Sequence, residues 1–405
     1  MSRASDPAEA QSSRSLMALL ALTAFVIAGG IHYQTPMLAA IAADLDADAA
    51  AMGWVPTLSF GGMFVGVVLL VPLGDRIDKR RIILIKIIVL TVAQAVMALA
   101  PSIGVLAIAS FVTGVVSSLA QSMVSIIAEA ARPQERGRAV GTLMTALFLG
   151  ILFARIAGGF MASHFGWRSS YVLSTALLLP VIPLLFARLP HTRTTTRASY
   201  GALMRSVLAL LVNQPDIRRV ALIQFMLGIC YGGFWAVVSP MVSAFHRLGP
   251  AQVGLIGIPG AAGILVARPA GRWTDRAGPM SVVTAALCAM ALAWLAFGFS
   301  AWSMVAVVAG AILLDCALRA AMVANQTLVN TVVPDARARA NTIFGTHVWA
   351  GNATGAFLAS STFAHFGWLA VCAVALVATS IALLVHVRAL RRVARARAPA
   401  IEESH

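Results

Sequence analysis

Twelve apolar runs of about 20 residues follow one another along this chain, and each is long enough to cross the hydrocarbon core of a bilayer as a helix. Backbone groups in lipid must be hydrogen-bonded within the segment, so these runs predict helices rather than open strands. Only 11% of the 405 residues are charged, against about 25% in soluble domains. We therefore expect an all-α membrane protein with transmembrane helices at residues 16–42, 51–73, 82–100, 103–130, 139–163, 169–187, 217–245, 251–271, 280–299, 303–332, 341–363 and 367–387.

Basic residues are distributed unevenly between the connections of these spans. Of the 30 Lys and Arg residues, 24 fall on one side, Arg168 and Arg247 fall on the other, and four lie within or near spans. Because basic residues are retained in the cytoplasm during insertion, this split predicts that both termini are cytoplasmic. It also accounts for the net charge of +15 without a nucleic-acid partner. The acidic loop DLDADAA at residues 44–50 would then be external.

Short motifs recur at a nearly constant separation. PQERGRA at 133–139 matches PDARARA at 334–340, and HFGW at 164–167 matches HFGW at 365–368, both 201 residues apart. An Asp-Arg pair after the second expected span recurs 200 residues later. The chain therefore reads as two six-helix halves in a parallel repeat. The expected divisions are a cytoplasmic tail (1–15), the first half (16–187), a cytoplasmic linker with room for one interfacial helix (188–216), the second half (217–388) and a basic cytoplasmic tail (389–405).

The Asp-Arg motifs resemble the loop motif of the major facilitator superfamily, and the resemblance covers nearly the whole chain. The first copy, VPLGDRIDKR, carries Leu73, Asp75, Arg76, Lys79 and Arg80 at matching positions, with Val71 and Asp78 in place of glycines. The second copy, GRWTDRAG, carries Gly271, Asp275, Arg276 and Gly278. The resemblance implies alternating access and a conformational lock formed by Asp75, Arg76, Arg80, Asp275 and Arg276. In such a lock, an aspartate would face the positive end of a helix dipole and the arginines would pair with neighbouring acids. The alternative is that these residues only orient the loop.

GILFARIAGG at 150–159 resembles the span-five motif of the drug:proton antiporter-like branch of that superfamily. Gly150, Gly158 and Gly159 match, and small residues there would allow close helix packing. Ala154-Arg155 replaces the central Gly-Pro of the motif, and Ser110 stands where the branch has its span-four arginine. The chain thus resembles an exporter of this branch while departing from it at two positions associated with proton relay.

Charges within the spans are the candidate functional groups. A charge at mid-bilayer costs roughly 2.5–3.5 kcal/mol on insertion scales, so such residues usually face a cavity. Asp315 and Arg319 lie near the middle of the tenth span at i,i+4 spacing, and can form a proton-coupling pair or a static structural pair. Arg155 in the fifth span is a candidate for binding an anionic substrate group or Asp315, with snorkelling as the alternative. Lys86, close to a basic loop, reads as a snorkelling lysine.

Polar residues elsewhere in the spans complete the candidate site. His32 and His347 can titrate near neutral pH and are further candidates for proton coupling, with packing as the alternative. The remaining candidates for substrate binding, beside Arg155, are amide, phenol and indole side chains, namely Tyr33, Gln34, Asn325, Gln326, Trp235, Trp349 and Asn352.

These features together predict a secondary active transporter that exports a small organic molecule by alternating access, in exchange for protons. The alternative is an importer or facilitator of an organic anion, suggested by two arginines against one carboxylate. No catalytic triad, phosphate loop or metal-ligand spacing occurs in the sequence, so we expect no enzyme activity, cofactor or metal. The expected partners are the substrate, protons and lipid, with no nucleic acid. The expected form is a monomer in a bacterial inner membrane.

Overall fold

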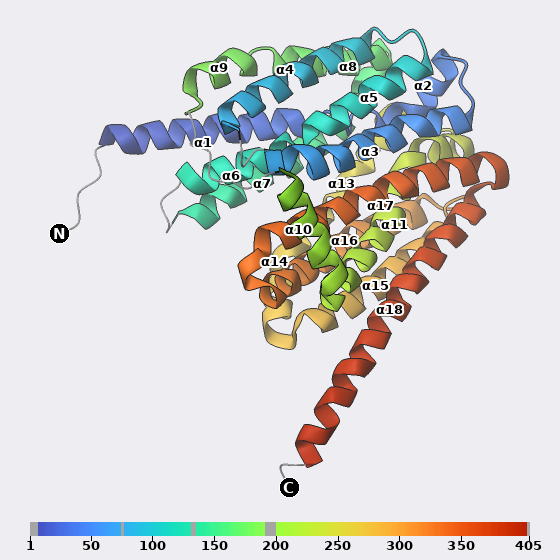
Figure 1. Ribbon diagram of the computed structural model, residues 1–405. Helices are drawn as coiled ribbons and strands as arrows, with labels where there is room; N and C mark the ends of the chain where they lie inside the picture. Colours follow the sequence, from blue (N-terminus) through green and yellow to red (C-terminus); the bar gives the residue numbers. More distant parts are fainter. Residues whose placement is uncertain (1–6, 74–76, 131–134, 191–199, 403–405) are drawn as a thin grey trace. The chain divides into compact units, whose positions relative to one another are not determined.

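The computed structural model describes residues 7–73, 77–130, 135–190 and 200–402, and within these ranges it is helical with no strand (Figure 1). The chain divides into two compact units. One comprises Met1–Tyr200 with Leu248–Gly257, and the other comprises Gly201–Arg247 with Ile258–His405.

The first unit contains the helices of the first six expected spans, together with one short helix from further along the chain. Its helices are α1 (Pro7–Ala28), the 3₁₀ helix η1 (Thr35–Met37), α2 (Leu38–Asp44), α3 (Ala49–Leu73), α4 (Lys79–Ala98), α5 (Ile103–Ser117), α6 (Leu119–Ala130), α7 (Arg136–Phe165), α8 (Trp167–Leu178), α9 (Val181–Arg188) and α12 (Pro250–Leu255).

The second unit contains the remaining spans. Its helices are α11 (Pro215–His246), α14 (Ala262–Ala277), α15 (Pro279–Phe297), α16 (Met304–Val332), η2 (Pro334–Ala336), α17 (Arg337–Phe366) and α18 (Trp368–Glu402). Two helices lie at the borders between the units in the sequence, α10 (Tyr200–Asn213) and α13 (Gly257–Gly260).

The expected twelve-span architecture is confirmed. Among the described residues, 10 helices are long and apolar enough to cross a membrane, judged by length and composition. The shorter apolar helix Ser15–Ala28 begins the first expected span, and α17 coincides with the eleventh. The expectation of an all-α membrane protein built from two six-helix repeats therefore holds.

Helix boundaries reproduce the repeat that the motifs predicted. Helix α17 begins and ends 201 residues after α7. Ser102 caps α5 by accepting a hydrogen bond from the backbone N–H of Val105, and Ser303, also 201 residues later, caps α16 in the same way. The two HFGW motifs end α7 and α17 at Gly166 (φ +81°) and Gly367 (φ +76°). A left-handed φ favours glycine, so the motif marks the turn between adjacent spans.

The two copies of the loop motif differ in backbone geometry. Gly278 has φ +79°, which ends α14 and allows α15 to begin at Pro279. Its counterpart Asp78 has φ −51°, and its carboxylate accepts a hydrogen bond from the Arg80 N–H at 3.0 Å. Aspartate is a favoured N-cap residue. The replacement of glycine in the first copy therefore gives α4 a side-chain cap.

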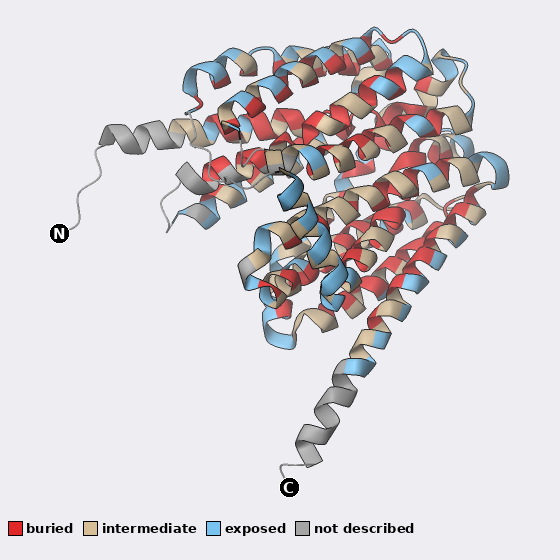
Figure 2. Cartoon of the chain, in the orientation of Figure 1, coloured by how far each residue is buried: buried red, intermediate tan, exposed pale blue. Residues whose placement is uncertain are grey.

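Glycines bring helices close together in both units. A Cβ at Gly232 of α11 would lie 2.3 Å from the Asn352 carbonyl oxygen, and one at Gly355 of α17 would lie 2.2 Å from that of Ile229. In α7, a Cβ at Gly150 would lie 2.0 Å from the Phe25 carbonyl oxygen. Such contacts are typical of packing in membranes, where close backbone approach takes the place of the hydrophobic drive. Buried residues accordingly follow most of α11 (Figure 2).

Candidate functional site

The first span is interrupted where its polar candidates lie. Helix α1 ends at Ala28, and residues 29–34 form turns before η1. His32, Tyr33 and Gln34 are all buried in this interruption. Interrupted helices expose backbone groups to ligands, and many transporters build their sites from them.

Gln94 of α4 supports the interruption, although it was not among the residues expected to form the site. Its Nε2 donates to the Gly30 carbonyl oxygen and to Thr113 Oγ1, both at 3.3 Å. The amide therefore satisfies a carbonyl that the broken helix exposes. A lone glutamine at helical spacing in an apolar run was the available signal.

Arg155 lies on α7 and is only 4% exposed, so its side chain is enclosed by protein atoms. A Cβ at Gly254 would lie 2.5 Å from the Arg155 carbonyl oxygen, and one at Gly257 would lie 3.1 Å from Arg155 Cδ. One turn along α7, a Cβ at Gly158 would lie 2.9 Å from the Tyr33 carbonyl oxygen. Burial of this kind argues against the snorkelling alternative and brings Arg155 and Tyr33 to the same region of the first unit.

Asp315 lies on α16 in the second unit and is 3% exposed. A Cβ at Gly260 would lie 3.1 Å from Asp315 Oδ2 and 3.0 Å from Trp235 Cζ2, so the carboxylate and the indole flank the same glycine. One turn along α16, Arg319 approaches Gly263, whose Cβ would lie 2.9 Å from Arg319 Cγ. The structure thus brings Trp235, Asp315 and Arg319 together around residues 260–263.

The eighth span is interrupted at this same point. Helix α13 ends at Gly260, Ala261 separates it from α14, and the Ala261 N–H donates to the Ile258 carbonyl oxygen at 3.0 Å. A buried carboxylate beside a broken helix is the arrangement that transporters use for ion and substrate sites.

The other candidates of the second unit have mixed environments. Asn325 and Asn352 are buried, whereas Trp349 and His347 are half-buried. His347 Nδ1 lies 2.8 Å from the Ile343 carbonyl oxygen. Gln326 is exposed, and its Nε2 lies 3.4 Å from Asn341 Oδ1.

The lock residues are described only in part. Asp75 and Arg76 lie outside the described residues. Arg80 donates through Nη2 to the Phe186 carbonyl oxygen at 2.5 Å, with its guanidinium 5.4 Å from the centroid of the Phe186 ring. In the second copy, Asp275 and Arg276 are exposed in the last turn of α14.

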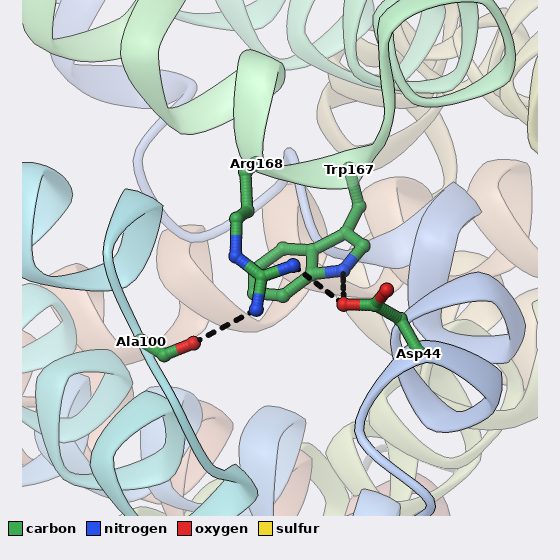
Figure 3. Close-up of polar contacts among 4 residues, drawn as sticks. All are labelled: Asp44, Ala100, Trp167 and Arg168. Atoms are coloured by element: carbon green, nitrogen blue, oxygen red, sulfur yellow. Dashed lines mark hydrogen bonds and ion pairs between the residues drawn. The ribbon is translucent and has the colours of Figure 1, made fainter.

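A polar cluster that the sequence reading missed joins three connections of the first unit (Figure 3). Asp44 Oδ2 accepts hydrogen bonds from Trp167 Nε1 at 2.9 Å and from Arg168 Nη1 at 2.5 Å. Arg168 also donates to the Ala100 carbonyl oxygen at 3.1 Å and lies over the Trp167 ring at 4.3 Å. The Trp167 bond and then the Arg168 contacts hold the pKa of Asp44 below its usual value. Asp44 and Arg168 were both expected in external loops, which was the available signal.

Comparison with known proteins places the chain in a family. The model of the Major Facilitator Superfamily matches residues 20–234 and 220–404. The uncharacterized transporter YgaY of Escherichia coli O157:H7 is 30% identical over 381 residues, which cover 94% of this chain and 97% of that protein. Multidrug resistance protein MdtG of Salmonella typhi is 24% identical over 312 residues, covering 74% of this chain and 75% of MdtG.

The fold agrees with that of solved transporters. The crystal structure of the nucleoside transporter NupG matches 92% of this chain and 98% of its own, with a TM-score of 0.77 at 14% identity. This likeness concerns the fold alone, whereas the family model and the relatives extend over the sequence. The chain is therefore a multi-pass membrane protein and a transporter rather than an enzyme, and it belongs to the major facilitator superfamily.

Proposed function

We propose that this protein is a secondary active transporter that exports a small organic molecule in exchange for protons. We further propose that it acts as a monomer in a bacterial inner membrane with both termini in the cytoplasm. The similarity to MdtG, a multidrug resistance protein, supports export. The excess of basic residues on one side of the spans supports the orientation.

The observation that carries proton coupling is the position of Asp315. Its carboxylate is buried beside Trp235 and the interruption of the eighth span. A carboxylate in this setting is costly unless it is protonated or compensated by a cation. Arg319, one turn away on α16, is the cation in the same unit that can compensate it.

The proposed exchange has two steps at this residue. In the substrate-bound state Asp315 is ionised and compensated by Arg319. On the outer side Asp315 takes up a proton from water, its pairing with Arg319 weakens and the substrate is released. On the cytoplasmic side Asp315 returns the proton to water, the pair re-forms and the substrate binds again. Proton and substrate are then bound in alternation, which is the minimum that antiport requires.

A transport measurement tests this proposal. Substrates are first identified by thermal-shift screening of the purified protein, and uptake into proteoliposomes is then measured with and without an imposed pH gradient. Asp315→Asn is expected to bind substrate at every pH with the weaker affinity of the protonated form, so that the pH dependence of binding is lost, and to abolish accumulation against a gradient. Asp46→Asn makes the same chemical change at an exposed carboxylate and is expected to behave as the wild type. Accumulation by Asp315→Asn would show that Asp315 is not the coupling residue, leaving His32 and His347 as the next candidates.

A second candidate function is import or facilitated passage of an organic anion, which the buried Arg155 favours. A planar guanidinium with five donors suits a carboxylate or phosphate. The two functions differ in direction and in dependence on membrane potential. Anion uptake driven by an inside-positive potential with no effect of a pH gradient would select this second function.

A further inference from the structure

Lys86 is the most unusual cation of the first unit. The chain has 30 basic residues, and only Lys79 and Lys86 among them are lysines. Lys86 is 3% exposed, and its Nζ donates to Ser118 Oγ at 3.0 Å. The snorkelling expected from the sequence is therefore not observed, because the side chain is enclosed by the protein. A lysine can lose its proton where an arginine cannot.

The partner of Lys86 marks an interruption of the fourth span. Helix α5 ends at Ser117 and α6 begins at Leu119, so Ser118 lies between them. Ser118 Oγ also donates to the Val115 carbonyl oxygen at 2.9 Å. A Cβ at Gly66 of α3 would lie 2.1 Å from the Val115 carbonyl oxygen and 3.0 Å from Ser118 Oγ. Helix α3 therefore packs directly against the junction between α5 and α6.

Among the side chains that the structure describes, Ser118 supplies a hydroxyl to Lys86 and none supplies a carboxylate. Helices α5, α6, α8 and α9 pack against α4. Their charged or titratable residues are Glu129 on α6, whose side chain is not among those described, Arg168 and Tyr171 on α8, and Arg188 at the end of α9. Within the part of the chain that the structure describes, no carboxylate lies within ion-pair distance of Lys86. A buried ammonium held by a neutral group alone is poorly compensated.

The repeat gives this position a counterpart in the second unit. The Ser102 and Ser303 caps fix a 201-residue offset between α5 and α16, and this offset aligns Ser118 with Arg319. In the second unit the repeat position carries a guanidinium on the span itself. In the first unit it carries a hydroxyl that binds the amine of Lys86 from the neighbouring α4. A cationic side chain thus lies at this position in the second unit and hydrogen-bonds to it in the first, but only the lysine of the first unit can release its proton.

A line of polar groups leads from Lys86 toward the interruption of the first span. Gln94 lies two turns further along the same face of α4 and contacts the Gly30 carbonyl oxygen and Thr113. Ser117 Oγ donates to the Thr113 carbonyl oxygen at 2.7 Å. Buried hydroxyl and amide groups therefore occupy the region between the two interrupted spans of the first unit.

We propose that Lys86 and Ser118 form a second protonation site, in which the Lys86 amine takes up one proton from water and the ammonium returns it during the transport cycle. In the protonated form, Nζ donates to Ser118 and steadies the junction of α5 and α6 against α3. In the neutral form this charge-assisted bond is weaker, and the junction is freer to move. The part of Lys86 in coupling rests on the proposed proton-driven transport, whereas its protonation at this site does not.

Nuclear magnetic resonance of the full-length protein in nanodiscs tests the protonation directly. The Lys79→Arg variant leaves Lys86 as the only lysine, so isotope-labelled lysine gives one side-chain nitrogen signal. We expect this signal to pass between ammonium and amine positions between about pH 6 and 9, because burial and neighbouring groups bring the pKa of some lysines down to about 7–8. A signal that stays in one form throughout would overturn the proposal.

A second set of variants separates this site from Asp315. The Lys86 transition is expected to persist in Asp315→Asn, so failure of the proposed coupling at Asp315 would leave the Lys86 site standing. Hydrogen–deuterium exchange of peptides covering residues 103–124 is expected to depend on pH in the wild type beyond the intrinsic exchange rate. Both Lys86 variants should lose this dependence. In Lys86→Met, which mimics the neutral amine, exchange should be fast at every pH, and in Lys86→Arg, which keeps its charge, exchange should be slow at every pH. Equal pH dependence in wild type and Lys86→Met would contradict the assignment.

Discussion

Trp167 and Trp368 begin equivalent helices of the two units, but their indole nitrogens donate to acceptors of different kinds. Trp167 Nε1 lies 2.9 Å from the Asp44 carboxylate, and Trp368 Nε1 lies 2.7 Å from the Phe297 carbonyl oxygen. The next residue is Arg168 in the first unit and Leu369 in the second. The repeat therefore conserves an indole hydrogen bond at the turn between spans, while only the first copy builds an ion pair around it.

Replacing Arg168 by leucine should convert the first copy to the pattern of the second with little loss of stability. The Arg168 and Asp44 side chains are 42% and 47% exposed, and exposed ion pairs contribute little. We expect the midpoint of thermal unfolding to fall by no more than a few degrees. Arg205→Leu removes another exposed arginine and serves as the control. A large fall for Arg168→Leu alone would show that the Ala100 contact and the stacking on Trp167 matter more than the ion pair.

The contribution of Asp44 should depend on pH in a defined direction. Its pKa is lowered in the folded state, so its stabilising effect is fully present above the unfolded value of about 4. The effect is lost as the pH falls through the lower folded pKa, because the unfolded state then binds the proton more readily. Asp44→Asn should remove this part of the acid sensitivity of the unfolding midpoint. Identical acid profiles for the variant and the wild type would contradict this expectation.

Asp78 should stabilise the start of α4 as an N-cap. Asp78→Ala is expected to cost about 1 kcal/mol, because it leaves the Arg80 N–H without its carboxylate acceptor. Asp78→Gly should cost only a few tenths of that, since glycine is itself tolerated at N-caps. Chemical unfolding of the purified variants in detergent would measure the difference. If Gly proves as harmful as Ala, another contact of the Asp78 carboxylate is responsible.

Gly260 should be intolerant of a side chain for a functional reason. A Cβ there would press on Trp235 and Asp315, so Gly260→Ala should impair substrate binding and its pH dependence together. Gly61 in α3 has nothing within 4 Å of its Cβ position, so Gly61→Ala is the matched control. Alanine favours a helix by up to about 1 kcal/mol over glycine, so the control should be neutral or slightly stabilising. Normal substrate binding by Gly260→Ala would show that residues 260–263 are not part of the substrate site.

Substitutions of Arg155 should separate the contribution of its charge to substrate binding from that of its planar geometry. Arg155→Lys keeps the charge but loses the planar fork, so it should weaken binding of an anionic or carbonyl-containing substrate, and Arg155→Ala should abolish it. Thermal shift with the substrate found by screening measures both. The unfolding midpoint without substrate and the elution profile show whether each variant is folded. Unchanged binding by a folded Arg155→Ala protein would assign Arg155 to packing.

The spans, their number and the two-fold repeat were readable from the sequence, because apolar length and motif spacing are local properties of the chain. The Asp-Arg motifs and the two HFGW motifs identified the family and the turns between spans for the same reason. Asp315 and Arg155 could also be recognised as unusual from the sequence, since a charged residue within an apolar run is apparent there directly.

Tertiary structure alone decided which of these residues meet. Glycine and proline residues accompany the interruptions near Gln34 (GGIHYQTP) and Gly260 (GIPG), whereas the one at Ser118 lies in the run VVSSLA. The point at which each span breaks depends on packing against other helices. Burial of Lys86 and its bond to Ser118 join residues 32 positions apart, and Arg168 meets Asp44 across 124 positions. Hydropathy determines which segments enter the membrane, because it is a property of the residues within one segment and does not depend on the other helices. The contacts between side chains depend on how helices distant in sequence approach, which is set by the glycines and polar groups that only the folded chain brings together.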